Sequence, residues 1–440
     1  MNDELRSSFD ALIVGAGPAG SAVAIQLARA GWSIALVERQ RFPRRKVCGE
    51  CIAASNLPLL QALGIGEAFD AQAGPALRKV TLLHGDGAVT ADLPAAAHGH
   101  FPWGRALGRE TLDSLLLAQA RAAGAVVFQP WALQAILGQA GAWHCELRAV
   151  EPAGLVRVRA KLVIDAHGSW EDLPPDRPKR RFARSAADLF AFKANFTGSV
   201  LPAGSISVLA LNGGYGGMVV ADGGVTTVAC CIRRDRLHLL RSAAPGLRAG
   251  DAVEAWLQSE CAGVRQALRG ARRDGPWLTS GPLGPGVRLD AEDEIFRVGN
   301  AAGEAHPILG EGMSMALQGA ALLCSHLLGP TSAATVPGAG LQAKLRRRYA
   351  ADWRRAFAPR LRLAALFAHL AMRPRSAAVL MKLTQAWPGL LTWGARWGGK
   401  VRFVGAVQPT HKRNRHEQHS RTPERHPGEG LQSGVGQPDT

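Results

Sequence analysis

One glycine-rich stretch near the N-terminus constrains the fold more than any other part of the chain. Apolar residues 11–14 predict a buried strand, Gly15-x-Gly17-x-x-Gly20 follows at once, and an alanine- and leucine-rich run to Ala30 predicts a helix. Gly15 permits the tight turn, Gly17 lets a pyrophosphate approach the backbone, and Gly20 lets the helix pack closely on the sheet. The helix N-terminus adds free N–H groups and partial positive charge for that pyrophosphate. The segment therefore predicts a dinucleotide-binding turn.

A carboxylate at the end of the next strand completes this motif. Residues 33–37 predict the strand, and Glu38 follows it, eighteen positions after Gly20 (38 − 20). This separation is close to the ~20 residues expected for an acid that binds a ribose. An acid here favours a free ribose diol over a 2′-phosphate. A glycine-rich turn that arose by chance would not be expected together with the strands, the helix and the acid in this order. Arg39, next to Glu38, is expected to contact the same nucleotide.

Length and charge limit the class of protein. The chain has 440 residues, 47% of them hydrophobic, and a formal net charge of +17. This length allows two or three domains with cores of their own. The positive charge is concentrated in arginine clusters, at 44–46, 179–181, 346–348 and 354–355. Such an excess suggests anionic surfaces or substrates, but a genome that prefers arginine explains it equally well. We expect no nucleic-acid partner.

Cysteine usage and hydropathy indicate the compartment. Seven irregularly spaced cysteines do not predict a disulfide framework and suggest a reducing environment. The polar residues 1–9 lack a secretory signal, and no run reaches the ~20 apolar residues that span a bilayer. Cys48-x-x-Cys51 lacks the second ligand pair of a zinc site, and the histidines at 98 and 100 are interpreted as loop residues, so no metal site is expected. The predicted location is cytoplasmic, with peripheral membrane contact as an open alternative.

The remaining chain shows a change of pattern. Residues 80–83 and 88–93 predict a hairpin, and 155–159 and 161–165 predict two strands. A Pro/Arg-rich linker at 174–184 precedes four antiparallel strands between 189 and 232. We further predict one amphipathic helix at 252–268, a return loop at 276–286, a helix that ends near Leu328, helical structure at 341–404 and a disordered tail.

Three segments together resemble flavin enzymes built like p-hydroxybenzoate hydroxylase. They are Gly15–Gly20, Asp165-Ala-His-Gly168, and the run from Val298 to Met313, which contains Gly-Asn-Ala-Ala-Gly and Gly310-x-Gly312. Their order and separation match over residues 8–328. The resemblance implies non-covalent FAD and an α/β fold, in which an antiparallel β-sheet substrate domain interrupts a Rossmann-like FAD-binding domain. The implied parts are an FAD-binding domain at 8–79, 104–170 and 285–330, a substrate domain at 80–103 and 180–284, a helical C-terminal cap at 341–405 and a disordered tail at 406–440.

A second resemblance is narrower. Residues 42–50 resemble the Cys-Gly segment of the geranylgeranyl-reductase-like branch and its monooxygenase neighbours, and 215–223 resemble that branch's substrate-domain strand more weakly. The resemblance places Cys48 near flavin and substrate, where a thiol can donate a proton or position the substrate. The cations at 44–46 would raise its reactivity. A small buried residue in a tight turn is the equally good structural interpretation.

The resemblance also implies roles around the flavin ring. Gly310 and Gly312 would let the backbone reach the ring edge, and the next helix would direct its positive end to the N1–C2=O region. Asn300 stands where the family usually has an aspartate, and its amide can still form hydrogen bonds without the charge. Arg109 matches the arginine that opens a helix near the cofactor in the family. The alternative for Arg109 is an ordinary salt bridge with Asp113 at the start of a helix. The implied cofactor contacts are Gly15, Gly17, Pro18, Ala19, Gly20, Glu38, Arg39, Cys48, Gly49, Arg109, Asp165, Gly168, Gly299, Asn300, Gly310, Glu311, Gly312 and Met313. The implied catalytic positions are Cys48, Pro307, Gly310 and Gly312.

These features predict an FAD-dependent oxidoreductase whose flavin is reduced by NAD(P)H. We favour a monooxygenase that acts on a hydrophobic small molecule. The alternative is a geranylgeranyl-reductase-like enzyme that reduces isoprenoid-type double bonds. A non-catalytic, membrane-associated flavin-binding protein is a third hypothesis, against which Gly310-x-Gly312 argues. Halogenation is disfavoured, because Gly49-Glu50 is not followed by lysine and no Trp-x-Trp occurs. The sequence leaves the substrate, the electron donor and the oligomeric state open.

The C-terminal region carries a separate hypothesis. Residues 361–372 have a broad apolar face and are too short to span a membrane. Cations and tryptophans surround this stretch, namely Arg373, Arg375, Lys382, Arg396, Lys400, Arg402, Trp387, Trp393 and Trp397. Such a composition suits a membrane interface. The alternative is a cap packed on the substrate domain.

Overall fold

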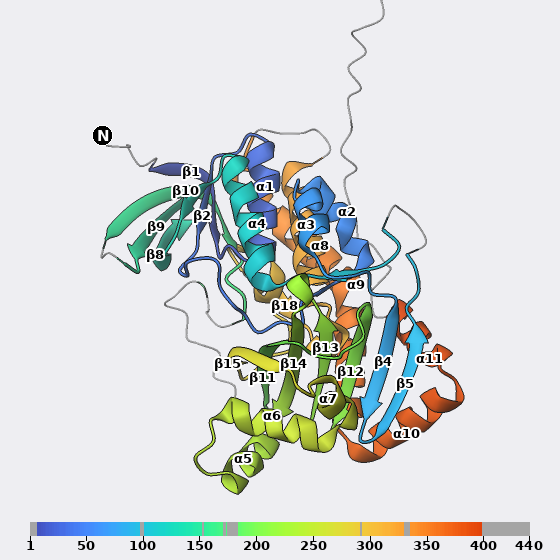
Figure 1. Ribbon diagram of the computed structural model, residues 1–440. Helices are drawn as coiled ribbons and strands as arrows, with labels where there is room; N and C mark the ends of the chain where they lie inside the picture. The colour runs from blue at the N-terminus through green and yellow to red at the C-terminus, as the bar shows by residue number, and fades with distance from the viewer. Residues whose placement is uncertain are drawn as a thin grey trace, which may run out of the picture. The chain divides into compact units, whose positions relative to one another are not determined.

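The computed structural model describes residues 7–96, 101–151, 154–169, 173, 184–290, 293–329 and 335–397. Two seven-stranded sheets organise this part of the chain, one in the upper and one in the lower half of Figure 1. The predicted disordered tail at 406–440, nearly all of the linker at 174–184 and the histidines at 98 and 100 lie outside the described residues. The mixed α/β class predicted from the sequence is confirmed.

The first sheet has a parallel centre. Its order is β7-β2-β1-β10-β9-β8, and β17 also pairs with β10. β7, β2, β1, β10 and β17 run parallel, whereas β9 and β8 continue the sheet antiparallel. The strands are β1 (Ser8–Val14), β2 (Ile34–Val37), β7 (Val126–Phe128), β8 (Trp131–Gln139), β9 (Ala142–Ala149), β10 (Leu155–Asp165) and β17 (Phe296–Arg297).

Two strands predicted at 155–159 and 161–165 form one continuous strand, β10. Ala160, at the predicted break, is buried and pairs with Phe9 on one side and Trp143 on the other. The first half of β10 therefore pairs with β9, while its end lies between β1 and β17. This end delivers residues 165–169 to the carboxyl edge of the parallel strands, beside the glycine turn that follows β1.

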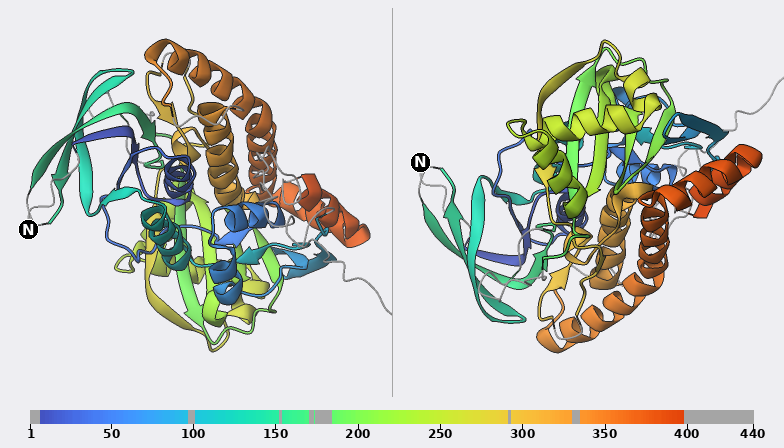
Figure 2. Two further views of the ribbon diagram at one scale, coloured as in Figure 1. Left: turned by 90° about the horizontal axis from the view of Figure 1, so that it is seen from above. Right: turned by 90° about the horizontal axis from the view of Figure 1, so that it is seen from below.

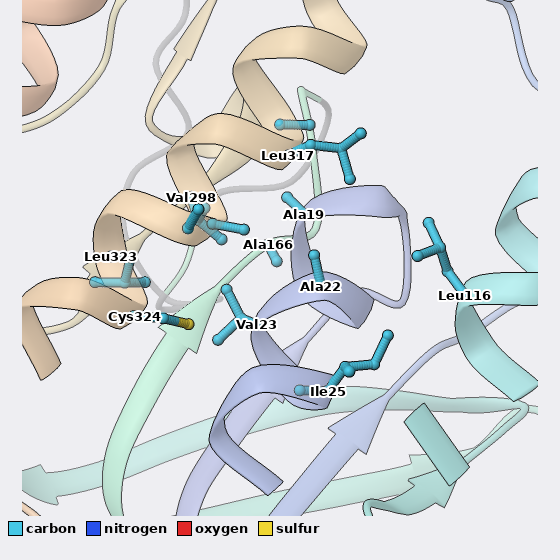
Figure 3. Packing of buried hydrophobic residues seen from close by; sticks show 14 of the residues in the cluster. Ala19, Ala22, Val23, Ile25, Leu116, Ala166, Val298, Leu317, Leu323 and Cys324 are labelled. Carbon is cyan, nitrogen blue, oxygen red and sulfur yellow. The ribbon is translucent and has the colours of Figure 1, made fainter. Parts of the chain in front are cut away.

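Helices cover one face of this sheet. α1 (Pro18–Arg29), α4 (Arg109–Ala122) and α8 (Gly312–Leu328) pack side by side. Figure 3 shows the alanines of α1 against leucines of α8 and α4, with Ala19 and Ala22 among the buried residues. Small side chains on α1 let the helices approach closely, and this places the N-termini of α1 and α8 at the same edge of the sheet. Shorter helices, η1 (Ala54–Asn56), α2 (Leu57–Ala62) and α3 (Gly66–Gln72), extend this layer.

The second sheet has the order β15-β11-β14-β13-β12-β4-β5. All neighbours are antiparallel except β12 and β4. The hairpin predicted near residue 80 thus joins strands from more than one hundred residues later in the chain. The strands are β4 (Lys79–His84), β5 (Gly87–Asp92), β11 (Leu189–Thr197), β12 (Ser205–Leu211), β13 (Gly214–Val220), β14 (Thr226–Arg233) and β15 (Arg272–Ser280).

The two faces of this sheet have different partners. Phe192 and Val228 pack under α6 (Ala249–Glu260) and α7 (Ala262–Ala267), which follow α5 (Arg234–Ala243). The single helix predicted at 252–268 is broken at Cys261, whose backbone is extended. The return loop predicted at 276–286 begins as β15, because Leu278 pairs with Lys193 of β11. The opposite face, with Tyr215 and Cys231, is free of these helices.

The C-terminal region forms α9 (Ala339–Ala371), α10 (Pro374–Ala386) and α11 (Gly389–Trp397). The helical stretch predicted at 341–404 is interrupted before Pro374 and before Pro388, where proline disfavours continuation of the helix, whereas Pro359 lies inside α9. α10 and α11 lie along the β4–β5 edge (Figures 1 and 2), where Thr392 donates a hydrogen bond of 2.6 Å to the Asp92 carbonyl. Within the described ranges, no helix has the length and apolar character to cross a membrane.

Short elements connect these layers around the carboxyl edge of the first sheet. They are β3 (Cys51–Ile52), β6 (Arg105–Ala106), η2 (Asp222–Gly224), β16 (Gly286–Val287), η3 (Gly299–Ala301), β18 (Gly303–Glu304) and η4 (Pro307–Leu309). β3 pairs with β6, and β16 pairs with β18.

Candidate active site

The glycine turn has the geometry that its sequence predicted. Gly15 has a φ of +102°, which favours glycine. A Cβ on Gly20 would lie 1.9 Å from the Gly15 carbonyl oxygen, so this position cannot hold a larger residue without movement. A Cβ on Gly17 would meet only the Arg109 guanidinium, at 3.8 Å. Gly17 therefore borders open space, whereas Gly20 is fixed by packing.

Glu38 fastens the turn to the neighbouring strand. Its buried carboxylate accepts hydrogen bonds from the Ala16 amide at 3.0 Å and the Gln40 amide at 2.9 Å, and Arg44 lies 3.4 Å away. A cavity of about 240 Å³ begins here, lined by Glu38, Arg39 and His167 among others. The buried Nε2 of His167 has no hydrogen-bond partner among the residues that the structure describes. The cavity thus offers a carboxylate and an unsatisfied imidazole to a polar ligand such as a nucleoside.

Three cations lie between this cavity and a larger one. Arg109 forms two hydrogen bonds of 2.8 Å with Asp113, and Arg44 lies 3.7 Å from the same carboxylate. Burial, together with Arg109 and Arg44, lowers the pKa of Lys46 to about 8. A buried lysine with depressed pKa gains from an anion that restores its charge. Arg44, Lys46 and Arg109 therefore suit a diphosphate that passes Gly17.

The larger cavity has a volume of about 550 Å³ and joins the two sheets. At the first sheet its lining residues include Gly17, Pro18, Ala19, Cys48, Gly49, Arg109, Gly168, Gly299, Asn300, Pro307, Gly310, Gly312 and Met313. A Cβ on Gly49 or Gly312 would meet no atom within 4 Å, so both glycines face empty space. At the second sheet the lining is mainly apolar, with Val80, Leu82, Ile206 and Val208. One compartment thus connects a glycine-bordered slot with an apolar chamber.

A buried polar network closes the junction of the two sheets. Glu50, only 2% exposed and with a φ of +58°, forms an ion pair with Lys193 of β11 and accepts a hydrogen bond from Thr227 of β14. The Arg109 amide donates to the same carboxylate at 3.0 Å. Cys48 accepts from the Glu50 amide at 3.3 Å. The Cys48–Glu50 loop is therefore anchored to the second sheet by a charge pair inside the protein.

The chamber has one polar wall. The Tyr215 hydroxyl lies 3.2 Å from His306 Nδ1, and the His369 ring lies 5.7 Å from the His306 ring. Burial and His369 lower the pKa of His306 to about 4, and burial raises the pKa of Tyr215 well above its usual range. Burial also raises the pKa of the Cys231 thiol to about 12. These groups are therefore neutral at physiological pH, so the chamber holds a hydrogen-bonding pair without charge.

A comparison with known families finds a match in the N-terminal part of the chain. Residues 8–186 match the family described as FAD binding domain. Over these residues the chain is therefore similar to FAD-binding domains. The glycine turn, the ribose acid, the cationic cluster and the open slot at Gly312 all fit FAD.

Curated relatives match over short stretches. Menaquinone reductase of Mycolicibacterium smegmatis is 43% identical over 66 residues, which are 15% of this chain and 16% of that protein. Tryptophan 2-halogenase of Chondromyces crocatus is 46% identical over 68 residues, which are 16% of this chain and 13% of that protein. The chain therefore matches about one sixth or less of their length, and their activities do not transfer to it directly.

Solved structures share the fold over most of the chain. The myxobacterial chondrochloren halogenase CndH has a TM-score of 0.69 at 18% identity and covers 88% of this chain and 91% of that one. A geranylgeranyl bacteriochlorophyll reductase-like protein from Thermoplasma acidophilum has a TM-score of 0.68 at 16% identity, with 86% and 91% coverage. PqsL, a probable FAD-dependent monooxygenase from Pseudomonas aeruginosa, has a TM-score of 0.62 at 15% identity, with 85% and 100% coverage. At these identities the likeness shows the fold alone.

Some residues predicted from the sequence as cofactor contacts point elsewhere. Asp165 does not line either cavity; its carboxylate contacts His167 and lies 3.7 Å from Arg297. The Glu311 side chain is buried behind the slot, 3.5 Å from Arg360 of α9. Asn300 does line the FAD slot and donates a hydrogen bond of 2.9 Å to Ser169. Asp165 and Glu311 thus shape the backbone around FAD, and direct contact through their side chains stays a prediction.

Several site residues had no separate signal in the sequence. Ser169 donates a hydrogen bond of 2.9 Å to Glu304, which Arg288 holds at 2.5 Å. Lys193 and Thr227 lie on ordinary alternating strands, and only the pairing of those strands brings them to Glu50. Among the residues that the structure describes, no three His, Cys, Asp or Glu side chains are grouped as metal ligands. Cys48 and Cys51 form no disulfide, and both line the large cavity.

The neutral state of His306 predicts a pH dependence of stability. Its pKa of about 4 lies below the ordinary 6.5, so the unfolded chain binds more protons between these values. The contribution of His306 to stability is complete above pH 6.5 and is lost as the pH falls toward 4. His306→Gln keeps an acceptor for Tyr215 without this titration. We expect its unfolding temperature to fall less than that of the wild type between pH 7 and 5, as measured by circular dichroism.

The control for this prediction is His144→Gln. His144 is exposed on β9, which belongs to the first sheet, whereas the chamber lies at the second sheet. If His306→Gln and His144→Gln show the same pH dependence as the wild type, His306 is not held neutral by burial.

Proposed function

We propose that the chain is an NAD(P)H-dependent monooxygenase that acts on a hydrophobic small molecule. The supporting observation is the cavity of about 550 Å³, which leads from the glycine-bordered FAD slot into an apolar chamber. This volume is shared by the FAD slot and the chamber, and pockets for drug-sized ligands span about 300–1,000 Å³. An inert flavin carrier has no use for such a chamber, so the cavity favours an enzyme. NAD(P)H needs no domain of its own in the superfamily that the sequence resembles.

The protein's own groups create the conditions for flavin chemistry. FAD, when bound, supplies electrons and the capacity to activate oxygen or transfer hydride. The N-terminus of α8 begins at Gly312, beside the slot, and its free N–H groups favour negative charge on a bound group. Apolar side chains from β4 and β12 lower the polarity of the chamber, and this strengthens electrostatic interactions inside it.

The polar wall favours a substrate with a hydroxyl or carbonyl group. Tyr215 lines the chamber, and its hydroxyl is hydrogen-bonded to His306. A neutral imidazole behind a neutral phenol can accept a proton that the phenol receives from the substrate. The rest of the chamber is lined mainly by apolar side chains. The proposed substrate therefore carries one polar group at Tyr215 and an extended apolar part.

A two-stage experiment tests this proposal. Anaerobic protein with bound FAD is mixed with NADH or NADPH, and bleaching of the flavin absorbance measures reduction. A long-chain alkylphenol is then added with isotopically labelled oxygen, and the product is analysed by mass spectrometry. We expect one labelled oxygen atom per turnover. Reduction of geranylgeraniol without label would establish the reductase alternative, and no turnover of either probe would contradict the proposed substrate class.

One observation favours the reductase as a second candidate. Cys48 lines the cavity beside Gly49, and Arg109 interacts with its sulfur. A thiol held there is in position to donate a proton to a carbon that receives hydride from reduced flavin. Cys51 also lines the cavity but belongs to β3, where its backbone pairs with Ala106. The two thiols therefore form a matched pair for mutation.

Cys48→Ala is expected to keep full FAD content and to lose turnover if the thiol acts on the substrate. Loss of a proton donor typically lowers the rate by about 10²–10⁴-fold. Cys51→Ala should stay within about twofold of the wild type, because Cys51 belongs to the paired strand β3 and is assigned no part in proton donation. The measurement is steady-state NAD(P)H oxidation with FAD content determined on the same samples. Equal activity of both variants would assign Cys48 a purely structural role.

A further inference from the structure

The outer surface of α10 and α11 carries an unusual concentration of exposed apolar side chains. Trp387 is 71% exposed, Trp393 58% and Leu383 49%, and Val379, Leu366 and Leu390 are also exposed. On α10, Val379 and Leu383 lie four positions apart on one side of the helix, and Trp387 follows directly after the helix ends. The opposite side of the helix, with Ala377 and Met381, is buried. A stripe of this kind on a folded protein marks an interaction surface. We refer to the exposed residues 366, 379, 383, 387, 390 and 393 as the apolar stripe.

Exposed positive charge flanks the apolar stripe. Residues 353–397 contain eight arginines and lysines and no aspartate or glutamate. Arg373, Arg375, Lys382 and Arg396 are exposed, and no carboxylate of the described residues forms an ion pair with them. Arg375 and Lys382 lie on α10 next to the apolar stripe. The partner that fits must therefore offer both apolar volume and negative charge.

The large cavity reaches the surface at the same place. Leu390 and Trp393 of α11 line the cavity and are also exposed. Leu380 and Thr384 of α10 and Phe367 of α9 line the same end. A molecule that leaves the chamber past Trp393 therefore emerges among the exposed side chains of the apolar stripe. The mouth of the cavity and the apolar stripe form one continuous feature.

We propose that the apolar stripe and its flanking cations dock on the surface of an anionic lipid bilayer. Tryptophan rings suit the headgroup boundary, leucine and valine suit the acyl region, and lysine and arginine suit anionic headgroups. A second copy of the chain fits poorly, because two such faces would bring cations against cations. In this position the cavity opens into the bilayer, and a membrane-dissolved substrate enters without crossing water. This last consequence rests on the proposed function, whereas docking itself does not.

Sedimentation with vesicles tests the docking surface independently of catalysis. Full-length protein with bound FAD is mixed with vesicles of phosphatidylglycerol or of phosphatidylcholine, in low and in high salt. We expect sedimentation with phosphatidylglycerol at low salt, release at high salt, and little binding to phosphatidylcholine. Charge reversal by Arg375→Glu with Lys382→Glu is expected to weaken binding about tenfold or more, since each basic residue near an anionic surface contributes about 1 kcal/mol. Leu383→Ser with Trp387→Ser should also weaken it.

Matched controls lie on α5, at the far side of the second sheet. Arg241 is an exposed cation there, and Leu239 is 59% exposed. Arg241→Glu and Leu239→Ser should leave vesicle binding unchanged, and retained FAD absorbance verifies that each variant is folded. The tail at 406–440 is present in every variant, so its contribution cancels.

Three outcomes would overturn the docking proposal. The first is wild-type protein that remains in the supernatant with phosphatidylglycerol at low salt. The second is an equal loss of binding in the α5 and α10 variants, which would indicate general charge attraction. The third is that the wild-type protein forms a dimer in the absence of vesicles and that the double variant Leu383→Ser with Trp387→Ser is a monomer. This result would make the apolar stripe a protein interface. Failure of vesicle binding with intact NAD(P)H oxidation would leave the proposed function standing.

Discussion

Gly17→Val is expected to abolish FAD binding while the apoprotein remains folded. Its backbone, with φ of −68° and ψ of −178°, is open to any residue, and a Cβ there meets only the Arg109 guanidinium at 3.8 Å. The two valine methyl groups would instead occupy the path of the diphosphate. Overpacking of this kind costs up to about 3 kcal/mol, which corresponds to a Kd for FAD raised about a hundredfold or more.

The matched variant is Gly20→Ala, only three residues further along the chain. Its single added methyl group would lie 1.9 Å from the Gly15 carbonyl oxygen, a backbone atom that cannot swing aside. We expect this smaller substitution to lower the unfolding temperature of the apoprotein, whereas Gly17→Val leaves it nearly unchanged. Flavin absorbance after gel filtration measures FAD content, and circular dichroism measures unfolding. Full FAD content in Gly17→Val would refute the nucleotide site.

The nucleotide-binding half of the site is predicted well from the sequence, because the residues that form it are close together in the chain. The turn, the helix N-terminus and Glu38 all lie within thirty residues, and their geometry follows from glycine conformation and strand–helix packing. The merged strand β10 shows where local patterns fail. Lys161 and Arg159 are polar positions around Ala160, and only pairing with Phe9 and Trp143 keeps the strand continuous. The break at Cys261 and the strand β15 likewise depend on partners distant in sequence.

The substrate half of the site depends on contacts that no local pattern encodes. Tyr215 and His306 are ninety-one residues apart, and Glu50 and Lys193 are separated by 143 residues. Lys193 follows apolar residues on β11 and resembles any inward polar residue of a strand. In the segment 42–50 the sequence predicts a functional role for the cysteine, Cys48. The structure shows that the glutamate of this segment, Glu50, makes the interactions with the second sheet. Long-range pairing of strands decides which faces meet, and it is not readable from one sequence.

The buried ion pair between Glu50 and Lys193 is expected to be essential for stability. Both side chains are 2% exposed, so removal of one partner leaves a charge without compensation inside the protein. Lys193→Met is expected to destabilise the protein by about 3–5 kcal/mol. The double variant Glu50→Gln with Lys193→Met should recover most of that loss, because it buries no charge. Glutamine keeps a side-chain oxygen that can accept the hydrogen bond from the Arg109 amide, and its NH2 group can donate to the Thr227 hydroxyl.

The comparison with an exposed pair makes this prediction specific. Lys161 lies 2.8 Å from Asp10, but its side chain is 56% exposed. Lys161→Met should therefore cost only about 0–1 kcal/mol. The measurement is the urea concentration at half-unfolding of all four proteins, with FAD bound. Equal shifts for Lys193→Met and Lys161→Met would mean that water screens the Glu50–Lys193 pair, and the Cys48–Glu50 loop would then need another anchor. If the double variant recovers stability but loses NAD(P)H oxidation, the charge pair serves to position Cys48 and Gly49 at the FAD slot, and stability alone does not explain its presence.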